Sequence, residues 1–335
     1  MADEIGRVRI LALYRILYSA TDEDHPLSAE ELCGLLKEQE IPTERKTLYR
    51  EITALRAYGV DVLSTRSPKA GFFLATREFE PPEVRLLTDA VLAAPFITEK
   101  KTGELVGKLR RLLSRGQAEG LAGLTDTEKR VKYDNEEIYY NIDSISRAIS
   151  RRKKISFEYY HRVIAGSSTV PDGGKQFVVS PYALLWNSDK YYLAGNNEKF
   201  DSLSHFRLDR MKRVAVLNKP ARPFEEVSDY HGTFDTADYA KKTFLMYHGE
   251  RQTVELRCSD EVLENMVDKF GEDLQFSARD SGTFTVRANV YVSRGLLEWL
   301  LQFGGRVEVL SPDSLRNEML EQIRQLNQAY GCYSQ

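Results

Sequence analysis

The chain has 335 residues, which is enough for two or three domains with cores of their own. Its hydrophobic content of 42% and charged content of 29% are ordinary for a soluble globular protein. The formal net charge of −3 excludes attraction to nucleic acid by the molecule as a whole, so any such attraction must come from one region.

The termini and cysteines bear on where the protein acts. The first residues lack the basic start and apolar core of a signal peptide, and no apolar run approaches the length of a membrane span. Cys33, Cys258 and Cys332 are far apart and form no pair of metal ligands. We therefore expect a cytoplasmic protein in a reducing compartment, with no membrane contact, metal or cofactor.

The N-terminal part predicts two amphipathic helices. Apolar residues recur at helical spacing from Ile5 to Tyr18. Ser28 precedes the second helix, and Glu31 three residues later completes a capping-box pattern. The residues expected to be buried in this helix are Leu32, Leu35 and Leu36.

The segment Ile41–Leu74 predicts a third helix and a β-hairpin. Thr43 is placed to cap the helix, and Gly59 is placed to end it. The buried stripe of this helix is expected to consist of Leu48, Ile52 and Leu55. The apolar runs Val60–Leu63 and Phe72–Leu74 flank a basic turn. Three helices followed by a hairpin predict a winged helix-turn-helix with the third helix in the recognition position.

Positive charge gathers on this third helix and hairpin. Between Ile41 and Arg77 there are seven basic and three acidic residues, and seven minus three gives plus four. A basic surface is what contact with phosphates requires. We expect base contacts from Arg45, Lys46 and Tyr49, base or phosphate contacts from Thr47 and Arg50, and backbone contacts from Arg66 and Lys69. The alternative is a three-helix bundle whose basic face is merely solvated.

Residues 79–140 predict a helical connector. The double proline Pro81-Pro82 is expected to interrupt regular structure before helices at Glu83–Ala94 and Glu104–Ser114. The residues expected to loosen the chain afterwards are Gly116, Gly120 and Gly123. The connector is expected either to contact a second copy of the chain or to pack on its own neighbours.

Residues 141–220 predict a small β-barrel. A helix at Asn141–Arg152 precedes five strands, expected at Ile155–Tyr160, Gln176–Trp186, Lys190–Asn196, Leu203–Arg207 and Val214–Leu217. Gly166–Gly174 predicts a flexible hairpin loop, and Asn187–Asp189 a tight turn. No helix interrupts the strands, which argues against a parallel nucleotide-binding sheet and favours an SH3-like or Sm-like barrel.

Residues 221–335 predict a ferredoxin-like β-α-β-β-α-β arrangement followed by an amphipathic helix at Ser314–Tyr330. The strands are expected at Arg251–Arg257, Leu274–Ala278, Thr283–Val292 and Val307–Leu310, and the helices at Asp260–Phe270 and Gly295–Gln302. The fold class is therefore α+β, with four parts: residues 1–78, 79–140, 141–220 and 221–335.

Arginines and aromatic residues in the predicted barrel indicate an anion site. His205, Arg207 and Arg210 offer donors, and Asp209 could orient a guanidinium. Rings on which a base could stack are those of Tyr182, Trp186, Tyr191 and Tyr192. Such a site suits a nucleotide, an oligonucleotide or another anion. The structural alternatives are core positions for Tyr192 and Trp186, and pairing of the arginines with Asp209 or at a strand end.

The order of these segments resembles the WYL-domain transcriptional regulators, which join a winged helix-turn-helix to a WYL domain and a C-terminal extension. The Trp-Tyr-Leu motif corresponds to Tyr191-Tyr192-Leu193, with tyrosine in place of tryptophan. The segment Phe206–Met211 resembles the arginine-bearing element of the family, and Thr47–Ile52 resembles the helix of DeoR-like winged domains. The resemblance covers nearly the whole chain.

The resemblance implies an Sm-like barrel, ligand-responsive control of transcription and, commonly, homodimers. It also implies a nucleotide or nucleic-acid effector at the basic surface of the WYL domain. By motif position this role falls on Arg207 and Arg210, and less directly on His205. The C-terminal extension is then a regulatory or dimerising part.

The sequence as a whole predicts a ligand-responsive regulator that binds a double-stranded DNA operator as a homodimer on two half-sites. One alternative is a nucleic-acid-binding accessory factor without an effector. The other is an enzyme acting on nucleotides, with His205 and Asp209 as an acid–base pair. The chain carries no HExxH, Walker A, GxSxG or CxxC pattern, so we expect no enzyme.

Overall fold

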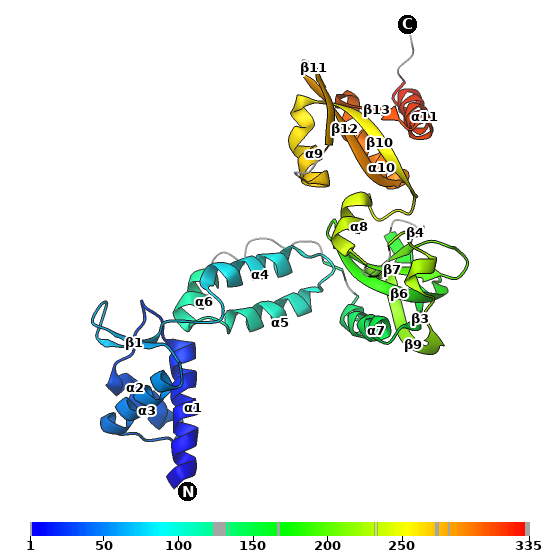
Figure 1. The fold of residues 1–335 in the computed structure, drawn as a ribbon. Coiled ribbons are helices and arrows are strands. Elements are labelled where there is room, and N and C mark those ends of the chain that lie inside the picture. The colour runs from blue at the N-terminus through cyan, green and yellow to red at the C-terminus, as the bar shows by residue number, and fades with distance from the viewer. Residues whose placement is uncertain are drawn as a thin grey trace. The chain divides into compact units, whose positions relative to one another are not determined.

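The structure, a computed structural model, describes residues 2–122, 132–133, 135–165, 168–230, 232, 234–271, 275–280 and 282–331. The chain forms two compact units, Met1–Asp134 and Asn135–Gln335 (Figure 1). Helices and several separate sheets occur along the chain, which confirms a mixed α+β protein. The finer division into four parts stays a prediction. Two residues discussed above, Gly123 and Cys332, lie outside the described residues.

The first unit begins with three helices and a two-stranded antiparallel sheet. The helices are α1 (Ala2–Ala20), α2 (Ala29–Glu38) and α3 (Arg45–Ala57), and the strands are β1 (Val62–Thr65) and β2 (Gly71–Leu74). In the β1–β2 hairpin, Val62 lies opposite Leu74 and Thr65 opposite Gly71. The shared core includes Leu13, Leu17, Leu32, Leu36, Leu48, Ile52 and Leu55. The predicted stripe of α3 is therefore confirmed.

The ends of these helices show which sequence signals fixed them. Ser28 and Glu31 form the predicted capping box of α2. The predicted cap at Thr43 is wrong: its hydroxyl donates to the Ile41 carbonyl at 3.0 Å, and α3 begins two residues later, after Glu44. At the other end Gly59 has φ 100° and ends the helix as predicted, because this left-handed conformation favours glycine.

Three further helices follow in the first unit: α4 (Pro81–Ala93), α5 (Glu99–Arg110) and α6 (Arg115–Ala122). The prediction that Pro81-Pro82 would interrupt regular structure is wrong, because both residues occupy the first turn of α4, where backbone N–H groups have no helical partner. The prediction that Gly116 and Gly120 would loosen the chain is also wrong, since both lie in α6. A Cβ on Gly116 would lie 2.4 Å from the ring of His25, so glycine allows this helix to approach closely.

The second unit begins with helix α7 (Ile138–Ser150) and a five-stranded antiparallel sheet in the order β8-β7-β6-β3-β9. Its strands are β3 (Lys153–Tyr159), β6 (Lys175–Asn187), β7 (Lys190–Asn197), β8 (Ser204–Arg207) and β9 (Met211–Pro220), and the 3-10 helix η1 (Leu208–Arg210) joins the last two. Ser188 and Asp189 form the predicted tight turn, with φ of 47° and 59°.

A separate exposed hairpin is formed by β4 (Arg162–Ala165) and β5 (Ser168–Pro171). The prediction that Gly166–Gly174 is all loop is therefore wrong over Ser168–Pro171, which pairs with β4; residues 166–167 lie outside the described residues. One face of the five-stranded sheet buries packed aromatic rings, with Phe157 and Phe206 5.1 Å apart. The other face is covered by the chain that follows β9.

That covering chain contains the 3-10 helix η2 (Phe224–Glu226) and helix α8 (Thr236–Lys242). A four-stranded antiparallel sheet follows, in the order β11-β12-β10-β13. Its elements, in chain order, are β10 (Glu250–Ser259), η3 (Asp260–Val262), α9 (Leu263–Phe270), β11 (Gln275–Asp280), β12 (Thr283–Val292), α10 (Arg294–Leu301), η4 (Gly304–Arg306), β13 (Val307–Ser311) and α11 (Asp313–Ala329). Within the described part of the chain, no helix is both long and apolar enough to cross a membrane.

Candidate nucleic-acid interface and anion site

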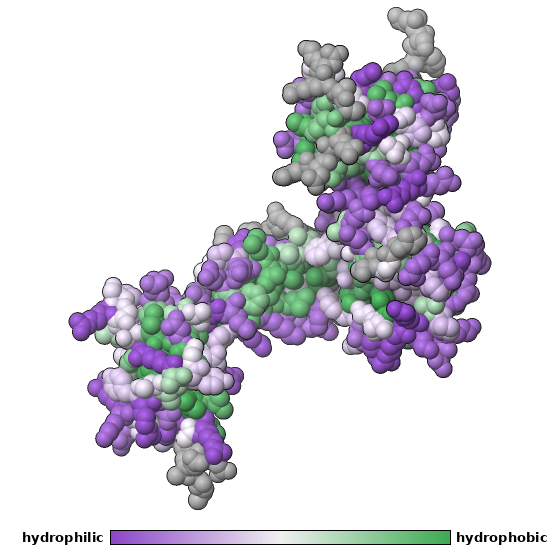
Figure 2. Space-filling model, viewed as in Figure 1, coloured by the Kyte–Doolittle hydropathy of each residue, from purple (hydrophilic) through white to green (hydrophobic). Residues whose placement is uncertain are grey.

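Helix α3 presents a basic surface opposite its buried stripe. Because Leu48, Ile52 and Leu55 pack into the core, helical spacing turns Lys46, Arg50 and Thr53 toward solvent. Figure 2 shows hydrophilic residues over much of the visible surface around α2 and α3, whereas apolar residues gather over α4 and α5. The side chains of α3 opposite its buried stripe therefore face solvent.

An acidic residue of α3 is withdrawn from this surface. Glu51 is only 9% exposed and accepts hydrogen bonds from Arg9 Nε at 3.1 Å and Nη2 at 2.7 Å. Charge counting had set Glu51 against the arginines of α3. Its spacing from Leu48 and Leu55 was the signal that could have placed it on the buried side. The outward face of α3 is thus more positive than the sequence count implied.

Two contacts hold the β1–β2 hairpin beside α3. The ring of Tyr49 meets the ring of Phe72 at 5.8 Å between centroids. Arg56 Nε donates to the Val62 carbonyl oxygen at 2.6 Å, so this arginine is engaged within the hairpin junction. A groove between α2, α3 and the hairpin is lined by Arg45, Tyr49 and Arg66, among others. The groove therefore brings together three of the seven predicted contact residues, Arg45, Tyr49 and Arg66.

These residues differ in how their charge is balanced. Arg45 pairs with Glu30 at 2.8 Å. Lys69 pairs with Glu31 at 2.6 Å, and this hydrogen bond, with another from the Ser28 backbone, lowers the pKa of Glu31 to about 2. Among the described residues, Lys46, Arg50 and Arg66 have no hydrogen-bond or ion-pair partner. Thr47 is half-buried beside them.

The second candidate site centres on Arg207, at the end of β8. Its guanidinium makes a two-point contact with Asp209, with Nε to Oδ1 at 3.0 Å and Nη2 to Oδ2 at 2.8 Å. The two side chains are only 18% and 10% exposed. The Arg207 backbone N–H donates to the Tyr159 hydroxyl at 3.1 Å, and Tyr192 lies opposite Arg207 in the sheet. The arginine is therefore held in one orientation.

Arg210 lies in η1, close to the same group. Burial raises the pKa of Tyr159 and of Tyr192, and the positive charges of Arg207 and Arg210 partly oppose that rise. Both phenols are thus neutral near neutral pH and able to donate. Within the described ranges, the Arg210 guanidinium has no hydrogen-bond or ion-pair partner. Two guanidiniums and two phenols in one place can bind an anion.

Tyr182 and His205 have other partners. The Tyr182 hydroxyl donates to the Arg222 carbonyl at 3.0 Å, and burial raises its pKa to about 12. His205 Nε2 lies 2.8 Å from the Tyr239 hydroxyl, and burial lowers the pKa of the imidazole to about 4. The structure therefore brings Tyr192, Arg207 and Arg210 together, while Tyr182 and His205 contact the chain that covers the sheet.

Two predictions about aromatic residues have different outcomes. The expectation that Tyr192 is a core residue is confirmed, because it is 8% exposed. The same expectation for Trp186 is wrong, because it is 51% exposed near the turn that ends β6. Sequence reasoning missed Tyr159, whose hydroxyl reaches Arg207 across 48 residues of sequence, and no local pattern could have found it.

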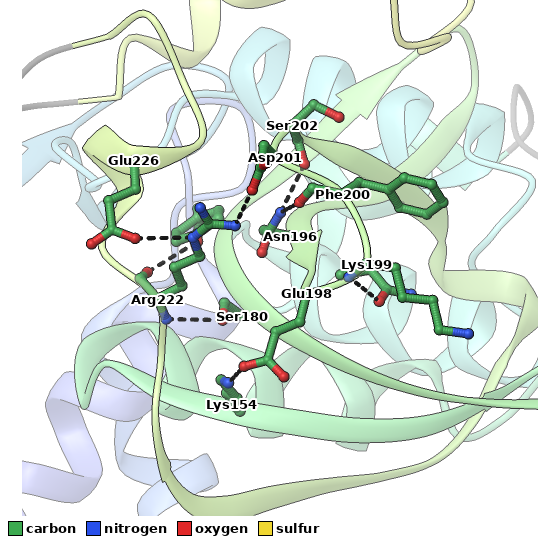
Figure 3. A network of polar contacts seen from close by, with 12 residues as sticks. Lys154, Ser180, Asn196, Glu198, Lys199, Phe200, Asp201, Ser202, Arg222 and Glu226 are labelled. Atoms are coloured by element: carbon green, nitrogen blue, oxygen red, sulfur yellow. Dashed lines mark hydrogen bonds and ion pairs between the residues drawn. The ribbon is translucent and has the colours of Figure 1, made fainter.

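A polar network fixes the loop that leads into β8 (Figure 3). Asn196 Nδ2 donates to the carbonyl oxygens of Phe200 at 2.7 Å and Ser202 at 2.9 Å. Arg222 binds Asp201 at 2.8 Å and Glu226 at 3.0 Å. The start of β8 is thus anchored independently of Arg207, which lies at its other end.

His205 and Asp209, the residues of the alternative acid–base pair, each contact a different partner. Asp209 is engaged by Arg207 and His205 by Tyr239, so these two residues are not an acid–base pair. In the part of the chain that the structure describes, no group of three or more His, Cys, Asp or Glu residues is placed to hold a metal ion.

Comparisons with known proteins identify two segments of the second unit. The family model of the WYL domain matches residues 140–216, and that of the WCX domain matches residues 250–326. The chain is 21% identical to the uncharacterized HTH-type transcriptional regulator YobV of Bacillus subtilis (strain 168), over 96% of this chain and 98% of that protein.

Among solved structures, proteasome accessory factor B/C (PafBC) of Arthrobacter aurescens is similar with 17% identity and a TM-score of 0.29. That match covers 94% of this chain and 47% of the other, so the chain spans about half the length of that structure. A CRISPR Cas-related protein is similar with 12% identity and a TM-score of 0.39, over 98% of this chain and 85% of that one. The chain therefore carries a WYL domain followed by a WCX domain, in the order that the sequence resemblance implied.

Proposed function

We propose that this protein is a DNA-binding transcriptional regulator that recognises double-stranded DNA through a winged helix-turn-helix formed by α1–α3 and the β1–β2 hairpin. The observation that carries the proposal is the outward face of α3, where Lys46 and Arg50 are exposed and Glu51 is withdrawn. The similarity to a protein named as an HTH-type transcriptional regulator supports it. Such a protein acts in the cytoplasm, on chromosomal DNA.

We assign the DNA contacts according to whether each side chain is unpaired or already held in an ion pair. Lys46, Tyr49 and Arg50 are exposed on α3 and are assigned to base edges in the major groove, with Thr47 beside them. Arg66 on the hairpin is assigned to the phosphate backbone. Arg45 and Lys69 would exchange Glu30 and Glu31 for phosphates on binding. This exchange lowers their net contribution, because an existing ion pair must break.

The WYL domain is then the sensor, with a nucleotide or single-stranded nucleic acid as effector. We assign the anionic group to Arg207 and Arg210, with the Tyr192 hydroxyl as a further donor. An Sm-like barrel and a ferredoxin-like C-terminal part are the arrangements that we assign to the two sheets. Effector binding changes DNA affinity only if the effector binds one arrangement of the protein better than the other.

A two-fold homodimer fits this function, because two copies of α3 then read two half-sites about one helical turn apart. Leu86 and Leu87 of α4 are exposed. Figure 2 shows apolar residues over α4 and α5. This surface leaves the connector available for the dimer contact.

The test is recovery of genomic DNA fragments by the purified full-length protein. Wild-type protein should enrich a small set of sites, Arg50→Ala should lose them, and Arg15→Ala should keep them. Arg15 is a fair control because it is also exposed, lies on α1 and has no ion-pair partner among the described residues. Equal recovery by wild type and Arg50→Ala would contradict the assignment of α3.

The effector assignment needs a separate measurement. DNA affinity should change on adding nucleotides or short single-stranded oligonucleotides, and the Arg207→Ala/Arg210→Ala double variant should lose that response. DNA affinity that ignores all of these compounds would favour the accessory factor without effector. Sustained turnover of a nucleotide, abolished by His205→Ala, would favour an enzyme instead.

A further inference from the structure

Helix α8 and the residues after it connect the WYL and WCX segments, yet belong to neither family match. The WYL match ends at residue 216 and the WCX match begins at residue 250. Between them, α8 (Thr236–Lys242) and the segment Thr243–Met246 lie against both sheets of the second unit. We refer to residues 236–246 as the latch.

The latch contacts the five-stranded sheet through His205. The Tyr239 hydroxyl lies 2.8 Å from His205 Nε2. Tyr239 and Met246 are buried together with Tyr192 in one apolar cluster. Residues of a strand alternate between its faces, so His205 and Arg207 of β8 share the face that the latch covers. The residue that the latch contacts, His205, is therefore two residues from Arg207, the proposed effector-binding arginine.

The latch contacts the WCX domain through different atoms. Lys269 of α9 donates to the carbonyl oxygens of Ala240 at 3.2 Å and Thr243 at 3.0 Å, near the end of α8. The ring of Phe244 packs on Trp299 at 5.0 Å between centroids. Gly295 lets α10 approach this point, since a Cβ there would lie 2.1 Å from the Phe244 carbonyl oxygen.

The end of the latch is strained. Leu245 and Met246 have φ of 48° and 55°, a left-handed conformation that residues with a Cβ rarely adopt. Such strain persists only where surrounding contacts enforce it. The contacts that enforce it here come from both sides: Met246 is buried in one cluster with Tyr192 and Tyr239, and the ring of Phe244 packs on Trp299.

We propose that residues 236–246 are a strained latch that couples strand β8 of the WYL domain to the WCX domain. A displacement of β8 breaks the His205 contacts, the strain at Leu245 and Met246 relaxes, and the latch carries the change to α9 and α10. The part played by a ligand rests on the proposed function, because the ligand enters at Arg207. The mechanical coupling between β8 and the latch does not depend on it.

The first test asks whether the strain exists, by hydrogen–deuterium exchange of the full chain. Leu245 is 42% exposed, so replacing it removes little packing. Leu245→Gly relieves the strain of the left-handed backbone, whereas Leu245→Ala retains it. The exchange rates of amides 243–247 should therefore be lower in the glycine variant than in the alanine variant by a factor of about five or more. Equal or faster exchange in Leu245→Gly would show that the segment is not strained and would overturn the latch.

The second test asks whether the latch and β8 move together. Tyr239→Phe removes the hydroxyl that meets His205 and leaves the ring in place. Amide exchange should then rise both at residues 243–247 and at residues 204–207. Tyr182→Phe is the matched control, because it removes a hydroxyl from the same cluster, but one that binds Arg222. A rise confined to residues 243–247, or no rise at all, would overturn the coupling.

The third test adds a fluorescein-labelled single-stranded hexanucleotide to the wild-type chain and measures anisotropy and amide exchange together. Binding accompanied by faster exchange at residues 243–247 is the expected result. Binding without that change would overturn the ligand-driven role of the latch. Absence of binding would count against the proposed effector, while the Tyr239→Phe result would still decide the coupling between β8 and the latch.

Discussion

Arg50 and Arg207 are the same residue type in opposite situations. Arg50 projects from α3 into solvent and has no ion-pair partner among the described residues. Arg207 is enclosed and held at two points by Asp209. A free guanidinium can adapt to a long polyanion such as DNA, whereas a fixed one selects a ligand of matching shape. The comparison shows that the surroundings of an arginine, more than its presence, indicate what kind of anion it can bind.

The largest expected effect comes from breaking the fixed arginine. Asp209→Ala leaves the Arg207 guanidinium without its partner in a nearly buried position, and we expect the free energy of unfolding to fall by about 3 kcal/mol. Asp209→Asn, which keeps the shape and one oxygen, should cost less. Denaturant titration of both variants measures this.

The exposed ion pair between Arg45 and Glu30 is the comparison for the enclosed pair between Arg207 and Asp209. Glu30→Ala removes the partner of Arg45 on the surface, where such pairs contribute only about 0.5 kcal/mol. If Glu30→Ala and Asp209→Ala destabilise the protein equally, the distinction between exposed and enclosed arginine pairs fails.

The free energy of unfolding should also depend on pH through the buried His205. His205 has a folded-state pKa of about 4, below the usual 6.5, because burial disfavours the charged imidazole. Between pH 6.5 and 4 the unfolded chain therefore binds more protons than the folded chain. The contribution of the neutral His205 to the free energy of unfolding is present above pH 6.5 and is lost as the pH falls through that window. The loss should reach roughly 3 kcal/mol by pH 4. His205→Gln should flatten this part of the stability profile, and an unchanged profile would contradict the enclosure of His205.

A smaller effect separates the two faces of α3. Glu51→Gln weakens the contact with Arg9 and should lower the free energy of unfolding by about 1 kcal/mol. Because Glu51 faces the core, the affinity of the folded variant for DNA should change less than about twofold. A large gain in DNA affinity would place Glu51 on the outward face, against the structure.

The smallest effect is expected at the hairpin tip. Glu31→Gln keeps the side-chain bond of the capping box and removes the charge that holds Lys69. The released lysine should raise DNA affinity by about two- to threefold at low salt, and the gain should fade as salt is added. Unchanged affinity at low salt would show that Lys69 does not approach DNA.

The sequence predicted the local parts of this account well. Helical spacing identified Leu48, Ile52 and Leu55, and with them the outward face of α3, because a helix is fixed by neighbours three and four residues apart. The capping box and the strand positions of the five-stranded sheet also followed from local patterns. The double proline misled, because the same residues that end one element can begin the next.

The arrangement of the candidate anion site could be predicted only in part. The short segment from His205 to Arg210 contains both arginines and Asp209, so their proximity could be predicted from the sequence. The positions of Tyr159 and Tyr239 depend on sheet pairing and on a covering helix, which no local pattern encodes. For the same reason the partner of His205 was missed, although the residue itself was singled out.

The most direct test of the central claim is the salt dependence of binding to a recovered DNA site, measured for wild type, Arg50→Ala and Arg15→Ala. Because Arg50 is assigned to base edges, Arg50→Ala should weaken binding by about tenfold or more at each salt concentration, while the slope of log affinity against log salt, which reports phosphate contacts, stays close to that of the wild type. Arg15→Ala should leave both the affinity and the slope unchanged. Equal affinities for wild type and Arg50→Ala would contradict the assignment of α3 as the DNA-reading helix.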